Sequence, residues 1–351
     1  MGSSRAPPTA DSTQARRNES AAPLAHVPKD VAGDWLPFGM DRPAFRPGVD
    51  TAAYFAAASH EAALAALAAA FARREPAVLI DGAAGVGKSL VARKWLDDLL
   101  PDVPRALLPN ARADKPADLL QAILFDLGKP YQGLTEQELR LALTGHLLDA
   151  AADGYPTVIV IDEAQHLSLS ALEELRLLGN LETRHGAAAF VVLVAQPTLR
   201  AAMLRPAYEL FADRVAVRCA IESLSAEESG AYLRHQVGAA GGDPARVLDE
   251  GAVELLTAAC AGVPRALNRA AGLAFELSAG AGAEVVDVEA AIEALGQLGI
   301  APPDEDGGDG GDAVLLPLAS EARVGKRKPA EPNERAAVRA PKEKAGRKRT
   351  A

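Results

Sequence analysis

The chain has 351 residues, of which 49% are apolar and 24% charged, and its formal net charge is −10. This composition is that of an ordinary globular protein of about two domains, and it excludes a collagen, a disulfide-stapled scaffold and a wholly disordered chain. The two cysteines, Cys219 and Cys260, lie far apart, which argues against a disulfide or a zinc site. No apolar run reaches the roughly 18 residues that a membrane span needs, and no secretory signal opens the chain. We therefore expect a cytoplasmic protein.

The charge is distributed unevenly along the chain. Residues 321–351 hold 11 Lys or Arg and 4 Asp or Glu, a net charge of +7, whereas residues 31–320 carry −18. Non-specific attraction of polyanions to so acidic a body is not expected. The basic tail, in contrast, is able to bind DNA phosphates or an anionic surface. Two other interpretations stay open: a solubilising end, or a segment that contacts the acidic body.

Helices and strands alternate through the first two thirds of the chain. Residues 1–33 lack apolar periodicity and are expected to be disordered, and an aromatic-rich stretch follows from Trp35 to Phe55. Apolar periodicity then predicts helices at 59–74, 88–100, 116–127, 135–152, from 170 onwards and at 198–204. Two of these helices begin with a capping-box pair, which is Thr135 with Glu138 and Ser170 with Glu173. Apolar runs predict strands at 77–81, 105–108, 157–161, 188–195 and 215–219. This order predicts an α/β fold with a parallel sheet covered by helices on both faces.

The pattern changes to helices alone after residue 220. Ser225 with Glu228 would open the first of them, and further helices are predicted near 248–260, 264–279 and 287–297, the last with Asp287 as its N-cap. We therefore expect a disordered segment at 1–33, an α/β domain at 34–220, a small helical domain at 221–300, and an acidic linker with a basic disordered tail at 301–351.

The segment GAAGVGKS at 82–89 matches the pattern GxxxxGK(S/T) of a phosphate-binding loop. A predicted strand precedes it and a predicted helix follows it, as that motif requires. Backbone N–H groups of such a loop and the N-terminus of its helix bind phosphate oxygens. Lys88 would reach the β- and γ-phosphates of a nucleotide, and the Ser89 hydroxyl would bind Mg²⁺. The expected nucleotide-binding residues are Gly82, Ala83, Ala84, Gly85, Val86, Gly87, Lys88, Ser89 and Leu90.

Polar residues follow two other predicted strands. In TVIVIDEAQHL, at 157–167, Asp162 would hold Mg²⁺ through water and Glu163 would polarise an attacking water. Gln196 follows the next long apolar run and is placed to orient that water or to sense the γ-phosphate. Arg214 and Arg265 are candidates for stabilising charge on a transferred phosphoryl group.

These segments together resemble the AAA+ ATPases, and within them the ExeA/GspA-type family, over about residues 35–297. The resemblance is carried by FGMDRPAF, the phosphate loop, VIVIDEAQHLS, LEELRLLGNLET, LVAQPTLR, LSAEESGAYLRHQV and GVPRALNRAAGLA. It implies a P-loop NTPase fold with a helical lid, ATP and Mg²⁺ as ligands, and the segment Phe38–Met40 near the adenine. It also implies that Gln196 is the sensor-1 residue, Arg265 the sensor-2 arginine and Arg214, or next Arg218, the arginine finger.

The resemblance also bears on partners. An arginine finger acts in trans in this superfamily, which implies a ring or helical homo-oligomer. Secretion-pathway members continue into a membrane span and a peptidoglycan-binding domain, which we do not expect in this chain. Short members look similar to the regulators of DNA transposition of the TniB and MuB kind, which partner a transposase.

Three roles therefore remain open: a DNA-linked ATPase, a secretion or envelope ATPase with a separate membrane partner, and a nucleotide-gated scaffold with little hydrolysis. The pair Asp162–Glu163 argues against the last. All six histidines stand alone in the sequence, no zinc ligand spacing occurs, and we interpret His166, after the acidic pair, as structural.

Overall fold

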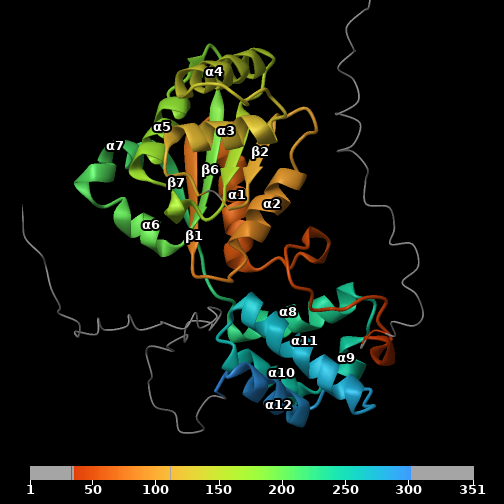
Figure 1. Ribbon diagram of the computed structural model, residues 1–351. Coiled ribbons are helices and arrows are strands. Elements are labelled where there is room, and N and C mark those ends of the chain that lie inside the picture. Colours follow the sequence, from red (N-terminus) through yellow and green to blue (C-terminus); the bar gives the residue numbers. More distant parts are fainter. Residues whose placement is uncertain (1–32, 34, 111, 302–351) are drawn as a thin grey trace, which may run out of the picture. The chain divides into compact units, whose positions relative to one another are not determined.

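The computed structural model describes residue 33 and residues 35–110 and 112–301. The basic tail and almost all of the two expected disordered ends lie outside these residues. Five parallel strands form the main sheet, in the spatial order β2-β3-β6-β1-β7 (Figure 1). Their bounds are Ala77–Gly82 for β1, Arg105–Leu108 for β2, Thr157–Ile161 for β3, Ala189–Ala195 for β6 and Val215–Ile221 for β7. The predicted parallel sheet is confirmed.

Helices cover both faces of this sheet. Their bounds are Ala58–Ala72 for α1, Lys88–Asp97 for α2, Pro116–Asp126 for α3, Glu136–Ala152 for α4, Leu169–Gly179 for α5, Pro197–Ala202 for α6 and Glu209–Ala212 for α7. Alternate residues of each strand point to opposite faces. Val78 and Ile80 pack against α1 and α2, whereas Leu79 belongs to the core under α3–α7. The inner strands β1, β3 and β6 are buried on both faces and are nearly continuous apolar runs, whereas the edge strand β7 has exposed residues at alternate positions.

Two local details differ from the sequence prediction. Helix α5 begins at Leu169, because Ser168 and not Ser170 is its N-cap and accepts the N–H of Ala171 at 3.2 Å. The expected capping partner Glu173 binds Arg176 instead. A two-stranded antiparallel hairpin of β4, Glu182–Thr183, and β5, Gly186–Ala187, was not predicted, since strands of two residues carry no periodicity.

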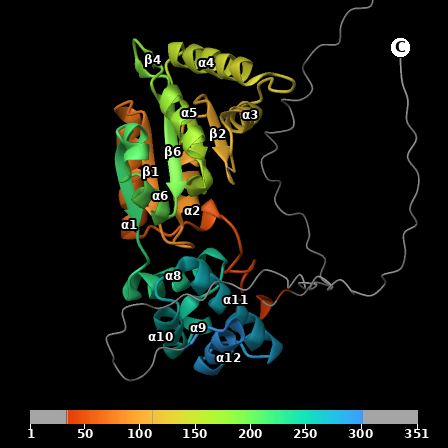
Figure 2. The same cartoon turned by 60° about the vertical axis from the view of Figure 1, so that its left-hand side comes forward.

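A second group of helices follows β7. It comprises α8 at Ala226–Ala239, α9 at Pro244–Val247, α10 at Glu250–Ala259, α11 at Pro264–Gly280 and α12 at Val288–Leu298 (Figure 2). The capping box of Ser225 with Glu228 is confirmed, as is the N-cap Asp287, whose side chain accepts the N–H of Ala290. The short α9, which opens with Pro244, was not predicted. These helices share one apolar core.

The aromatic segment before α1 packs on this second group of helices. The segment contains two short 3₁₀ helices, η2 at Leu36–Phe38 and η3 at Thr51–Ala53. Two others among the described residues, η4 at Ala164–His166 and η5 at Pro206–Tyr208, lie in the α/β part. The Phe38 ring lies 4.7 Å from the Phe275 ring in an edge-to-face contact, and Phe45 lies 5.6 Å from it. The amide of Gln236 donates to the carbonyl of Ala53 at 3.0 Å. Residues 35–57 thus add apolar side chains to the helical core, although the sequence pattern placed them with the α/β domain.

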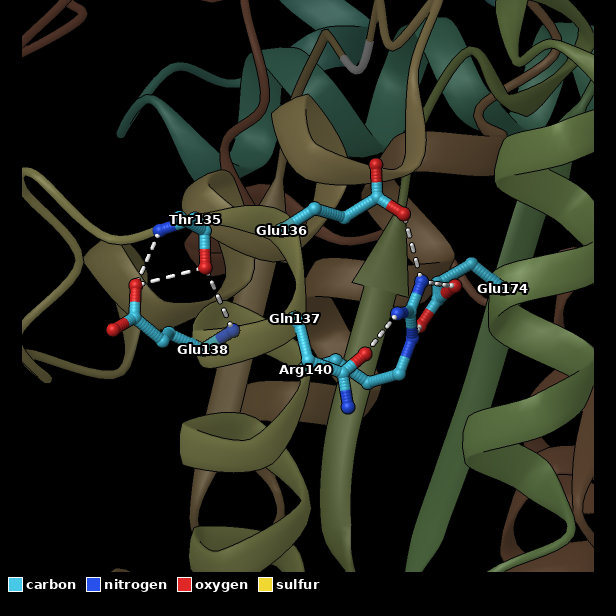
Figure 3. Close-up of polar contacts among 6 residues, drawn as sticks. All are labelled: Thr135, Glu136, Gln137, Glu138, Arg140 and Glu174. Atoms are coloured by element: carbon cyan, nitrogen blue, oxygen red, sulfur yellow. Dashed lines mark hydrogen bonds and ion pairs between the residues drawn. The ribbon is translucent and has the colours of Figure 1, made fainter.

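A buried carboxylate joins α4 to α5 (Figure 3). The side chain of Glu174 is only 3% exposed, and it accepts Nε and Nη2 of Arg140 at 2.8 Å each. The same guanidinium donates to Glu136 and Gln137 on its own helix. The hydrogen bonds to Glu174 and then to Glu136 raise the pKa of Arg140 above its ordinary value.

Replacing Arg140 by Met should destabilise the fold by about 2–3 kcal/mol, because it leaves the Glu174 carboxylate buried without its cation. This is less than the full penalty of a buried pair, since the Arg140 side chain is 29% exposed. Urea unfolding followed by circular dichroism measures the effect. The matched control is Arg176→Met, whose partner Glu173 is 42% exposed and which should cost below about 1 kcal/mol. Equal losses in the two variants would contradict the buried-pair interpretation.

Candidate functional site

Three neighbouring strands end at one edge of the sheet, and each is followed by residues of the predicted site. Strand β6 lies between β1 and β3. In register, Asp81 at the end of β1 pairs with Ala195, and Ile161 at the end of β3 pairs with Leu193. The glycine-rich loop, Gln196 and the Asp162–Glu163 pair therefore leave the sheet side by side. This edge is where open parallel sheets bind their ligands.

The conformation of the glycine-rich loop between β1 and α2 depends on its own backbone angles and on the close approach of a neighbouring strand. Gly85 and Gly87 have φ of +87° and +102°, which residues with a Cβ rarely adopt. A Cβ on Gly82 would lie 2.4 Å from the carbonyl oxygen of Ile221. Helix α2 begins at Lys88, directly after the loop, so its N-terminal N–H groups and positive dipole end face the space that the loop surrounds.

Lys88 is buried inside this loop. Its Nζ donates to the carbonyls of Gly82 at 2.9 Å and Ala83 at 2.7 Å, and the residue is 7% exposed. Burial lowers the pKa of Lys88, whereas the carboxylates of Glu163 and Asp162 act to raise it. The loop carbonyls therefore orient the ammonium, and both carboxylates lie close enough to interact with it electrostatically.

Asp162 and Ser89 contact each other across the site. Burial raises the pKa of Asp162, while hydrogen bonds from the Ser89 hydroxyl and from the N–H of Glu163 lower it. The Glu163 N–H donates to Asp162 Oδ1 at 2.9 Å. A hydroxyl and a carboxylate that already meet are a suitable oxygen donor set for Mg²⁺, which prefers such hard ligands and keeps several waters. The residues present thus fit the metal that the motif implies.

Glu163 adopts a left-handed backbone conformation, with φ of +54° and ψ of +36°. Non-glycine residues in this region are strained, and such strain gathers at functional sites. Its carboxylate accepts the side-chain amide of Gln165, and His166 Nε2 lies 3.9 Å from the same oxygen. Both predicted acidic residues therefore lie at the site, and His166 lies beside them.

Gln165 is a site residue that the sequence analysis missed. Its amide nitrogen donates to Glu163, and its amide oxygen accepts the backbone N–H of Gln196 at 3.0 Å. One side chain thereby links the carboxylate after β3 to the end of β6. Gln165 stands in the short η4 turn, where apolar periodicity offers no signal, so only its spacing from Glu163 could have drawn attention to it.

A second missed contact lies under the site. Asp81, which is 3% exposed, is the last residue but one of β1, and Arg200 Nη1 on α6 lies 3.5 Å from its Oδ1. Arg200 lies in the last turn of α6, so this ion pair joins that helix to the strand that carries the loop.

Arg265 contacts the glycine-rich loop directly. Its backbone N–H donates to the carbonyl of Gly85 at 3.2 Å, and a Cβ on Gly85 would come within 2.8 Å of Arg265 Cβ. The charge of Arg265 also acts to lower the pKa of Lys88. The structure thus brings together the loop and the first turn of α11, in which Arg265 lies.

The other two arginines lie on the surface. Arg214 and Arg218 are exposed, and Arg218 Nη2 donates to the carbonyl of Ala212 at 3.0 Å. Within the part of the chain that the structure describes, no hydrogen bond or ion pair joins either side chain to the glycine-rich loop. Phe38, expected near an adenine, is 3% exposed and its ring is buried against Phe275.

A phosphate-binding loop after the first strand of a parallel sheet, an acidic pair after a neighbouring strand and a helical lid define the class of P-loop nucleotide-binding proteins. Residues 72–203 match the family model of an AAA domain. Over 232 residues the chain is 32% identical to general secretion pathway protein A of Aeromonas hydrophila. The aligned residues cover 66% of this chain and 42% of that protein. The chain is thus similar to AAA+ ATPases of the ExeA/GspA type, and it spans about two fifths of the length of that relative.

Solved structures show the same fold. The ORC2 protein of Aeropyrum pernix superposes with a TM-score of 0.58 at 16% identity, covering 73% of this chain and 72% of that one. Cdc6p of Pyrobaculum aerophilum has a TM-score of 0.58 at 15% identity, covering 72% and 70%. At this identity the likeness concerns architecture alone. Among the described residues, no helix combines the length and the apolar character needed to cross a membrane.

Proposed function

We propose that this chain binds ATP with Mg²⁺ and hydrolyses it, as an oligomeric switch or motor. The observation that carries the proposal is the meeting of Lys88, Asp162 and Glu163 at one edge of the sheet. The charges of both carboxylates act on the pKa of Lys88, and the charges of Glu163 and Lys88 act on the pKa of Asp162. Each of these groups performs a separate task in phosphoryl transfer, which depends on positioning and on stabilisation of charge.

The loop and Lys88 bind and orient the triphosphate. The N–H groups of the loop and of the first turn of α2 donate to phosphate oxygens, and the Lys88 ammonium neutralises their charge. Ser89 and Asp162 would hold Mg²⁺, which supplies further neutralisation of the phosphate charge. Glu163 accepts a proton from, or orients, the attacking water, while Gln165 holds the Glu163 carboxylate in place.

Two arginines complete the proposed site. Arg265 contacts the loop at Gly85, which supports a role for it beside the phosphates as sensor-2 arginine. Arg214 is exposed and has no side-chain partner among the described residues, which suits a finger that enters the site of a neighbouring copy, with Arg218 as the alternative. Gln196 is proposed as sensor-1 residue, since its backbone is tied to Glu163 through Gln165.

Two biological roles fit this chemistry. The net charge of +7 on residues 321–351 favours a DNA-linked role, as in a regulator that partners a transposase, although these residues lie outside the described part. One of the similar folds, the ORC1 protein of Aeropyrum pernix, was solved in complex with DNA, at 20% identity and a TM-score of 0.57. The identity to general secretion pathway protein A favours the alternative, an envelope or secretion role with a separate membrane partner.

Steady-state ATP turnover of the full chain, measured with and without double-stranded DNA at low and moderate salt, tests the proposal and separates the two roles. We expect turnover that needs Mg²⁺ and that DNA stimulates less as salt increases, because salt weakens phosphate contacts. Removal of residues 321–351 should abolish the stimulation and leave the basal turnover. Basal turnover indifferent to DNA would favour the envelope role, and bound ATP without any turnover would favour a nucleotide-gated scaffold.

A further inference from the structure

His60 lies in the first turn of α1 and contacts the glycine-rich loop from outside. The residue is 4% exposed, and its Nε2 lies 2.8 Å from the carbonyl oxygen of Val86. A carbonyl oxygen only accepts, so Nε2 carries the hydrogen and donates it. In the neutral ring Nδ1 then carries the lone pair, and this atom is buried without a hydrogen-bond partner among the described residues. A buried ring nitrogen without a hydrogen-bond partner costs free energy, so its presence here calls for an explanation.

The hydrogen bond from His60 to Val86 fixes the orientation of one peptide group of the loop. In a trans peptide the carbonyl of one residue and the N–H of the next point in opposite directions. Because His60 holds the Val86 carbonyl on the outside, the N–H of Gly87 is directed away from His60. Gly87 itself has φ of +102°, and a Cβ there would lie 2.9 Å from His60 Nε2. The imidazole therefore fits against the loop only because position 87 is glycine.

The same turn of α1 also contacts the second group of helices, α8–α12, which forms the lid. The N–H of Ala58 donates to Glu228 Oε1 at 2.9 Å, and Glu228 Oε2 accepts the N–H of Ser225 at 3.0 Å. These two hydrogen bonds lower the pKa of Glu228. One carboxylate thereby caps both α8 of the lid and α1. The first turn of α1 is thus fastened at one end to the lid and, through His60, to the loop.

We propose that His60 is a positioning residue for phosphate binding: its Nε2–H fixes the peptide between Val86 and Gly87 so that the Gly87 N–H is presented to the bound phosphates. This rests on the proposed nucleotide function and adds a residue outside the phosphate-loop motif to it. The side chain acts through the loop backbone and does not touch the nucleotide. A neighbour that merely filled space would not need a donor at this point.

Nucleotide affinity of three variants of the full chain tests the proposal, measured by calorimetry with ATP and ADP in the presence of Mg²⁺. His60→Phe keeps an aromatic ring but removes the donor, and we expect about tenfold weaker binding of both nucleotides, the loss of one oriented hydrogen bond. His60→Gln places an amide N–H near the position of Nε2, and it should recover most of the affinity. His60→Asn is too short to reach the Val86 carbonyl and should behave like His60→Phe.

A second histidine supplies the matched control. His146 on α4 also has a buried, unpartnered ring nitrogen, but it packs on the opposite face of the sheet from α1. His146→Phe should leave nucleotide affinity unchanged. Wild-type affinity in a folded His60→Phe variant, or a His60→Gln variant no better than His60→Asn, would overturn the proposal. Absence of ATP binding by the wild-type chain itself is the separate result that refutes the proposed function.

The ring tautomer gives a readout that a packing role would not move. In a long-range ¹⁵N–¹H spectrum of histidine-labelled protein, the His60 signals, assigned by their loss in His60→Gln, should show hydrogen on Nε2 and none on Nδ1. They should shift when ADP is added, because the Val86–Gly87 peptide lies between the ring and the phosphates. Hydrogen on Nδ1, or signals insensitive to ADP, would contradict the proposed contact.

Discussion

Replacement of Glu163 by Gln is expected to leave ATP binding close to that of the wild type and to reduce steady-state turnover by about 10²–10⁴-fold, the usual contribution of a positioned base. The amide has nearly the same shape as the carboxylate but does not accept a proton. The loop, Lys88 and the Ser89–Asp162 contact lie elsewhere in the site and remain intact. Equilibrium binding of ATP and turnover by phosphate release, measured on the same preparation, check both halves of this expectation.

A neighbouring carboxylate supplies the control for Glu163. Glu173 is 42% exposed and pairs with Arg176 on the surface of α5, so Glu173→Gln should change neither binding nor turnover by more than about twofold. Normal turnover in the Glu163→Gln variant would show that another group activates the water. Loss of ATP binding in that variant would instead show that the charge of Glu163 supports the nucleotide site as a whole.

Lys88→Ala should lose nucleotide binding, by about a hundredfold or more. Lys88 is 7% exposed and its ammonium is already oriented by two loop carbonyls, so the triphosphate would gain a fixed cation at little entropic cost. Without the ammonium, the acidic residues Asp162 and Glu163 would face the phosphates unopposed. Fluorescent-nucleotide titration with Mg²⁺ measures the change, and circular dichroism checks that the variant is folded.

Lys94 is the matched control for this substitution. It lies on the same helix, α2, but its Nζ pairs with Asp98 at 2.6 Å on the surface. Lys94→Ala should bind ATP as the wild type does, with a stability loss below about 1 kcal/mol. Equal affinity in folded Lys88→Ala and Lys94→Ala would mean that the glycine-rich loop is not a phosphate site.

Much of the fold and the site could be predicted from the sequence, because the relevant signals are local. The strand Thr157–Ile161 is an uninterrupted apolar run, and the structure has the same bounds for it. The phosphate loop is a contiguous motif. Its glycines permit the backbone conformation at their own positions, and two of them have positive φ. Asp162 and Glu163 directly follow a buried strand, and parallel strands end at a common edge. Their convergence with Lys88 also needs the strand order, which only the structure gives.

Contacts between residues that are distant in sequence, or that lie in turns, were decided by the tertiary structure alone. The side chain of His60 meets Val86, 26 positions later, and Gln165 meets Gln196, 31 positions later. Neither residue repeats with a period or belongs to a motif that specifies its partner. The same holds for Phe38, whose apolar ring could have joined either core and is buried against Phe275. Periodicity records which face of an element is apolar, whereas which surface covers that face depends on the packing of the whole chain.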